Sequence, residues 1–177
     1  MKLLWLGFAA LISVWLLDPD QTDPDLDETD TIAIAKANFL YQFALGNEWP
    51  TQTKDGYFRI AVIGSPNVYQ DLVARYASKP IGNQPIEVVL LPNTDITSYY
   101  HMVYVGKNQE SILNDVLEQI DGQPTMVVTN AKVAADKGAT ISFIVKDSMI
   151  RYMINASEAE KRNISIGSKI LSWAISN

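Results

Sequence analysis

The 177-residue sequence contains no cysteine and only one histidine. The absence of cysteine excludes disulfides, thiol redox sensing and cysteine catalysis, so the core must hold itself together. A metal centre built on several histidines is likewise impossible. We therefore expect no metal, no cofactor and no catalytic residue.

The sequence also lacks an excess of positive charge, with 14 basic and 20 acidic residues. Seven of the acids lie between Asp18 and Asp30, and residues 31–177 are close to neutral. Because nucleic-acid binding requires a basic surface, we expect no nucleic-acid partner. The apolar share of 47% is typical of a folded domain.

A long hydrophobic run occurs only at the N-terminus, where Lys2 precedes a 15-residue apolar stretch, residues 3–17. That length suits a signal peptide and is short for a membrane-spanning helix. We expect residues 1–17 to be a cleaved signal peptide or a retained anchor, with a buried hydrophobic helix as a third reading. Residues 18–30, rich in acids and proline, are expected to form a solvated linker, with a calcium-binding or cationic docking tail as the alternative.

Residues 31–177 are expected to form one domain, because helical and apolar segments alternate along them. Helices are predicted over 31–46, over 67–77 and between a cap at Asn108 and a stop at Gly122, and strands over 58–63, 86–91, 101–105 and 125–129. Segments 140–146 and 149–154 are joined by two residues, which favours an antiparallel hairpin. We predict an α/β fold with a mostly parallel central sheet of about six strands, helices on both faces and a C-terminal antiparallel hairpin. Two terminal helices are expected near 156–162 and 165–176.

Two segments carry a family resemblance. Lys36 to Phe43, continuing to Trp49-Pro50, resembles the opening motif of the YfiR-like family, and residues 144–174 resemble its closing block. The closing block is carried by Tyr152 to Asn155, Ala159 to Ile164 and Ser168 to Ala174. The resemblance covers residues 31–175 and rests on structural motifs rather than on a catalytic signature.

The resemblance implies a non-enzymatic periplasmic protein that binds the outer part of a membrane diguanylate cyclase or sensor kinase. It would thereby control cyclic-di-GMP and biofilm formation, and we expect it to act as a dimer. The sequence departs from the family at Asn163, where glycine is usual, although asparagine tolerates a left-handed φ. Gly167 replaces a serine just inside the last helix and should weaken that helix by up to about 1 kcal/mol.

Three polar residues follow predicted strands. Ser65 and Asn67 open the helix after strand 58–63, and Asn130 follows strand 125–129. Ligands of doubly wound sheets bind at such strand ends, although an ordinary capped turn explains the same residues. His101, at a strand start, is expected either to contact a ligand and change charge near pH 6 or to be a satisfied structural histidine.

Further candidates lie near the C-terminus. Arg151 in the hairpin could pair with a carboxylate of a ligand or partner, or simply be solvated. Glu158 and Lys161, beside Ile164, could form a docking surface or a solubilising helix face. Trp49 and Trp173 are expected to be packing anchors, Trp49 with the alternative of lining a small-molecule pocket together with Tyr41.

Three functional hypotheses remain in competition. The first is the periplasmic regulator, and the second is a small-ligand binding module that uses the turns at 64–67 and 129–130. The third is a hydrolase based on Ser65 or on carboxylates such as Asp71 and Asp95, for which the sequence offers no paired base.

Overall fold

The computed structural model describes residues 30–106, 110–130, 137–146 and 149–175. The expected signal or anchor segment, 1–17, and nearly all of the expected linker lie outside the described residues. The main sheet has six strands in the order β3-β2-β4-β5-β6-β7, which are parallel except for the antiparallel β6–β7 pair. The strands are β2 (Phe58–Ile63), β3 (Ile86–Leu91), β4 (Met102–Val105), β5 (Met126–Thr129), β6 (Ile141–Lys146) and β7 (Met149–Ile154). The predicted α/β fold with its C-terminal hairpin is confirmed.

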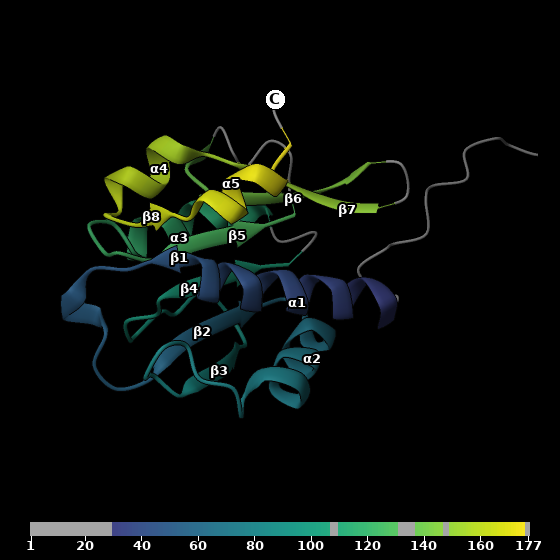
Figure 1. Cartoon of the computed structure of the whole chain (residues 1–177), viewed down its shortest axis with the longest axis horizontal. Coiled ribbons are helices and arrows are strands. Elements are labelled where there is room, and N and C mark those ends of the chain that lie inside the picture. Colours follow the sequence, from purple (N-terminus) through teal and green to yellow (C-terminus); the bar gives the residue numbers. More distant parts are fainter. Residues whose placement is uncertain (1–29, 107–109, 131–136, 147–148, 176–177) are drawn as a thin grey trace, which may run out of the picture.

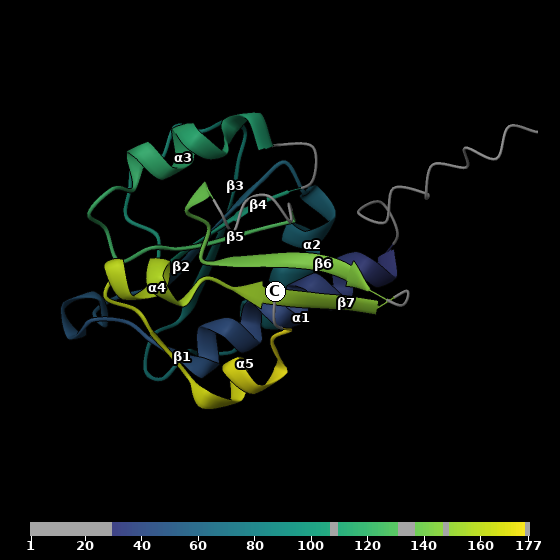
Figure 2. The same ribbon diagram turned by 90° about the horizontal axis from the view of Figure 1, so that it is seen from above.

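Helices cover both faces of this sheet, as expected. They are α1 (Asp30–Gly46), α2 (Pro66–Tyr76), α3 (Leu113–Gln119), α4 (Ala156–Lys161) and α5 (Ser168–Trp173), with 3₁₀ turns η1 (Thr51–Thr53) and η2 (Glu110–Ile112). Figure 1 shows α1 running along one face with α2 beside it. In Figure 2, α3 lies on the other side of the sheet from α1 and α5.

The core has two layers because alternate strand residues point to opposite faces. On the α1 side, Ile60 and Val62 pack with Phe43, whereas Ala61 lies on the α3 side with Val116. Strands β2, β4 and β5 are almost wholly buried, which explains why they appear in the sequence as continuous apolar runs.

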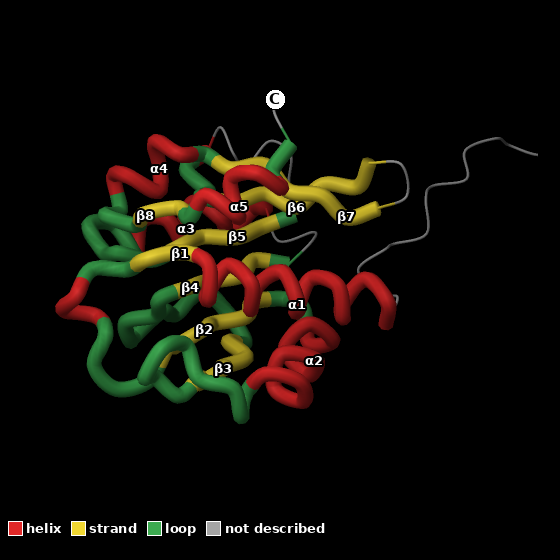
Figure 3. Tube along the Cα trace, viewed as in Figure 1, coloured by secondary structure: helices red, strands yellow, loops and turns green. Residues whose placement is uncertain are grey.

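A second, two-stranded sheet was missed by the sequence analysis. β1 (Asn47–Glu48) pairs antiparallel with β8 (Ser165–Ile166), as Figure 3 shows in yellow between the red helices. The expectation of a helix over 165–176 is therefore wrong at its start, since α5 begins only at Ser168. Two-residue strands have no periodicity of their own, and tertiary contact alone creates them.

Gly167 also differs from its prediction. It precedes α5 with extended backbone angles, φ −69° and ψ 148°, so it does not weaken the helix interior. A Cβ placed on Gly167 would lie 2.0 Å from the carbonyl oxygen of Gly46. Glycine is therefore required at this position, because the end of α1 approaches too closely for any side chain.

The two tryptophans expected to be packing anchors, Trp49 and Trp173, differ in their burial. Trp49 is a packing anchor, as expected: it is buried, and its indole Nε1 donates to the backbone oxygen of His101 at 3.0 Å. The same expectation for Trp173 is wrong, because that side chain is 48% exposed and carries the Lys169 ammonium 4.7 Å above its ring. Asn163 adopts φ 55°, which confirms the left-handed turn expected there.

Candidate functional site

The carboxyl ends of the parallel strands carry a small polar cluster. Ser65 is buried at the start of α2, and Asn130 follows β5. The Asn130 amide Nδ2 donates to the Tyr104 hydroxyl at 2.8 Å, and Ser65 also hydrogen-bonds that hydroxyl. The structure thus connects, through Tyr104, two residues that the sequence predicted at the same end of the strands. Asn67 lies in the first turn of α2 and is half-buried.

Tyr104 is the member that sequence reasoning missed, because a tyrosine inside an apolar strand is typical of core packing. Burial raises the pKa of Tyr104 far above its ordinary value, while hydrogen bonds from Asn130 and Ser65 act in the opposite direction. The phenol therefore remains protonated at physiological pH. Neutral hydroxyl and amide groups of this kind can orient a polar ligand, but this trio contains no base able to activate Ser65.

The switch point of the sheet lies between β2 and β4, where strand order reverses. There the Gly106 N–H donates to the Ile63 oxygen at 2.8 Å. A Cβ on Gly106 would lie 2.7 Å from the Gly64 oxygen, so the backbones of the two turns are in contact. The polar cluster of Ser65, Tyr104 and Asn130 lies at this same end of the strands, where Ser65 and Tyr104 are themselves buried.

His101 lies at the opposite, amino-terminal end of the parallel strands, immediately before β4. Its ring Nδ1 accepts the Arg59 backbone N–H at 3.1 Å, and Nε2 contacts the Thr53 carbonyl oxygen at 2.7 Å. A backbone N–H can only donate, so the neutral ring carries its proton on Nε2. The Phe58 ring stacks on it with centroids 4.4 Å apart. The fold uses both nitrogens, and a ligand would have to displace one of these bonds.

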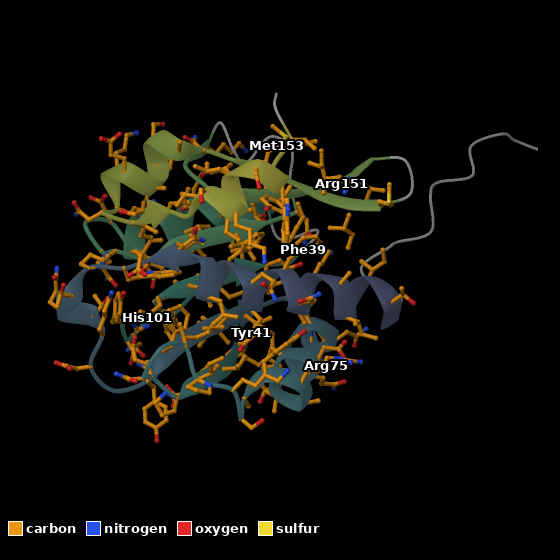
Figure 4. The ribbon with its side chains drawn as sticks, in the orientation of Figure 1. Phe39, Tyr41, Arg75, His101, Arg151 and Met153 are labelled. Atoms are coloured by element: carbon orange, nitrogen blue, oxygen red, sulfur yellow. The ribbon has the colours of Figure 1, made fainter. Side chains whose placement is uncertain are left out.

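The pKa of His101 is lowered, first by burial and also by the nearby Arg59 charge, against the effect of the Thr53 hydrogen bond. The neutral ring is thus favoured in the folded protein. Figure 4 places His101 at the other end of the molecule from Arg151 and Met153. His101 and Arg151 therefore cannot belong to one site.

Arg151 is exposed on β7, whereas its neighbour Tyr152 points into the core, as the alternation predicts. The Arg151 guanidinium contacts the sulfur of Met149 at 3.8 Å. The Tyr152 hydroxyl donates to the Ile170 carbonyl oxygen at 2.7 Å and holds α5 against the sheet. Arg151 is accordingly a surface cation on the hairpin.

The closing-block residues lie in and after α4. The Asn155 side chain caps this helix by accepting the Glu158 N–H at 3.2 Å. Glu158 pairs with Lys161 at 2.5 Å, and the Lys161 side chain is 69% exposed. Ile164 is buried in the core beneath α4, so it anchors this region and does not add an exposed contact.

A cavity of about 340 Å³ lies between the end of α1, β1, β2 and the turn at 81–84. Trp49 and Phe58 form part of its lining, and Glu48 pairs with Lys54 at 2.7 Å at its side. The alternative reading of Trp49 as a pocket wall is thus correct in part. Tyr41 is not in this lining, because its ring stacks on Tyr76 with centroids 4.4 Å apart.

A model of the YfiR/HmsC-like family matches residues 34–175, which is most of the chain. The protein belongs to the YfiR/HmsC-like family. That family is regulatory and non-catalytic, is generally periplasmic, and no enzymatic family is indicated.

Other comparisons add the fold alone. No curated protein matches the chain. A solved structure titled as the ABC domain in complex with L-Trp from Streptococcus pneumonia aligns with a TM-score of 0.51 at 14% identity. The alignment covers 80% of this chain and 59% of that one, so the chain spans less than two thirds of the matched protein.

In this YfiR/HmsC-like protein, no group of three or more histidine, cysteine, aspartate or glutamate side chains among the described residues could hold a metal ion. Within the same residues, no helix is both long and apolar enough to cross a membrane. The contacts described at the two ends of the parallel strands are hydrogen bonds and packing contacts.

Proposed function

We propose that the protein is a periplasmic regulator that binds the outer domain of a membrane diguanylate cyclase or sensor kinase. Such binding would tune cyclic-di-GMP and biofilm output. The observation that carries this proposal is family membership over residues 34–175. The apolar run 3–17 after Lys2, followed by an acidic stretch, supports export across the inner membrane.

The exposed face of α4 is the surface we propose for the partner. Its cap at Asn155 and the buried residues Ala159 and Ile164 hold this short helix firmly on the domain. Glu160 and Lys161 are exposed, and the Lys161 ammonium pairs with Glu158 at 2.5 Å. A rigid helix with exposed charge of both signs can give specificity through complementary charges on the partner.

Affinity capture of the full chain from solubilised membranes of cells that encode it tests this function. We expect a membrane cyclase or sensor kinase to be recovered with the wild-type chain. Lys161→Glu should weaken that binding about tenfold, equivalent to about 1.4 kcal/mol. Lys79→Glu is the matched control, because Lys79 is exposed and lies against the Tyr76 ring beyond α2. Recovery of no membrane sensor would count against the proposed function. An equal loss of binding in Lys161→Glu and Lys79→Glu would count against α4 as the binding surface.

A second function, small-molecule binding, is favoured by the cavity beside Trp49. Its lining combines apolar side chains with polar ones, among them the Glu48–Lys54 pair, and suits a compact ligand that carries both apolar and polar groups. Thermal-shift screening of the purified chain against small metabolites tests it. A stabilising ligand should lose its effect in Lys54→Met while the melting temperature of that free variant stays unchanged. The absence of any shift across the library argues against this second function.

A further inference from the structure

In the part of the chain that the structure describes, the outer edge of β3 pairs with no other strand. β3 and β7 are the two end strands of the main sheet, so each has one neighbour only. β3 runs Ile-Glu-Val-Val-Leu-Leu with no lysine or proline inside it, the residues that usually protect such edges. Leu90 is 40% exposed on this strand. An apolar strand edge of this kind is a template for another strand.

The register of the sheet shows which backbone groups face outward. Phe58 lies opposite Ile86, and the Phe58 N–H donates to the Pro85 oxygen at 2.8 Å. In a parallel ladder, alternate residues of one strand bond the same neighbour. Residues 85, 87, 89 and 91 therefore face β2. Ile86, Val88 and Leu90 present their N–H and C=O groups to the outside.

Both ends of this outward row are closed by the chain itself. Pro92, the next outward position, has no N–H. On the other side, the Gln84 N–H donates to the Ile81 oxygen at 3.0 Å, and the Gln84 oxygen accepts from Ile81 at 2.9 Å. Among the described residues, the outward row that has no backbone partner thus consists of three residues with three donors and three acceptors, and Val88 is its centre.

We propose that two copies of this chain form a symmetric dimer in which their β3 strands pair antiparallel about Val88. Val88 then lies opposite Val88 of the second copy, and Ile86 lies opposite Leu90. Each of these pairs exchanges two hydrogen bonds, so every outward group of both strands is satisfied. The exposed Leu90 side chain is covered by Ile86 of the second copy, and the two sheets join into one.

Three further observations favour a second copy at this edge. A twofold axis requires a self-complementary patch, and a row centred on one residue meets that condition. Glu87, the only charged residue of β3, already pairs with Arg59, so dimerisation brings together no unpaired like charges. The other sheet edge is partly covered, because the Tyr152 oxygen accepts the Ile175 N–H at 3.0 Å.

The absence of native cysteine makes the pairing directly testable in the full chain. In the proposed dimer, the two Val88 Cα atoms lie about 5.5 Å apart, inside the window of about 4.4–6.8 Å that a disulfide spans. Val88→Cys should therefore form a covalent dimer on a non-reducing gel after mild oxidation. Ile86→Cys and Leu90→Cys should each remain uncross-linked when oxidised alone, because each residue lies about 14 Å from its own counterpart in the second copy. An oxidised mixture of these two variants should cross-link.

A second measurement does not depend on cysteine placement. Sedimentation velocity of the wild-type chain should show a dimer, and Leu90→Lys should shift it to monomer without changing its circular dichroism spectrum. Val73→Lys, which changes another exposed apolar residue (39% exposed), should leave the dimer intact. A monomeric wild-type chain overturns the proposal. So does a dimer in which Val88→Cys does not cross-link or in which Leu90→Lys has no effect. None of these results depends on the proposed sensor partner.

Discussion

The side-chain oxygen of Asn47 accepts a hydrogen bond from the Gly167 backbone N–H at 3.0 Å, although the two residues are 120 positions apart. The same amide donates through Nδ2 to the Phe43 oxygen at 2.9 Å. One buried side chain therefore ties the end of α1 to the segment between β8 and α5. The opening and closing family motifs meet at this contact.

Asn47→Ala should lower the free energy of unfolding by about 2–3 kcal/mol, because it leaves the part-buried Gly167 N–H and the buried Phe43 carbonyl without this partner. Urea denaturation followed by circular dichroism measures the change. Asn38→Ala is the control, since Asn38 is exposed on the same helix, and its stability should stay near that of the wild type. Equal midpoints for the two variants would contradict the role given to Asn47.

Gly167→Ala should destabilise the fold by about 1–3 kcal/mol or more, because the new methyl group overlaps the Gly46 carbonyl oxygen. Ser168→Ala provides the comparison one residue later, at an exposed position. Thermal unfolding should show a clear drop for the first variant and little change for the second. A stabilised Gly167→Ala would instead support the helix-propensity reading of this glycine.

His101 should make stability depend on pH. Its folded pKa lies below the unfolded value, so the unfolded chain binds the proton more readily, and stability falls as the pH drops below about 6.5. Urea unfolding at pH 7.5 and 5.5 measures this difference. In His101→Gln the difference should shrink, because no other histidine titrates in this window. If the pH dependence of stability is unchanged in that variant, a group other than His101 is responsible for it.

Tyr152→Phe should cost about 1–2 kcal/mol, because the buried Ile170 carbonyl oxygen loses its donor. Burial raises the pKa of Tyr152 to about 12, so the hydroxyl stays a donor at every pH used for such work. Tyr57→Phe is a suitable control, as Tyr57 is 57% exposed. The loss should appear in the denaturation midpoint, and a Tyr152→Phe midpoint equal to that of Tyr57→Phe would show that the bond contributes nothing.

Most elements could be predicted because each carries a local signal. The strands 58–63, 86–91 and 149–154 have the expected bounds, and α1 extends the expected 31–46 by one residue. Ser65 and Asn130 could be placed at the same sheet edge, since both follow parallel strands. Tyr104, which connects them, was missed because its hydroxyl meets them only when β4 lies between β2 and β5.

The sequence by itself determined the α/β class, the strand alternation and the C-terminal hairpin, because hydrophobic period and turn chemistry act over a few residues. Only the tertiary structure decided the pairing of β1 with β8, the need for Gly167 and the exposure of Trp173. Each of these depends on segments more than a hundred residues apart or on what covers a surface. Such contacts arise when the chain closes on itself, and no local pattern of residues encodes them.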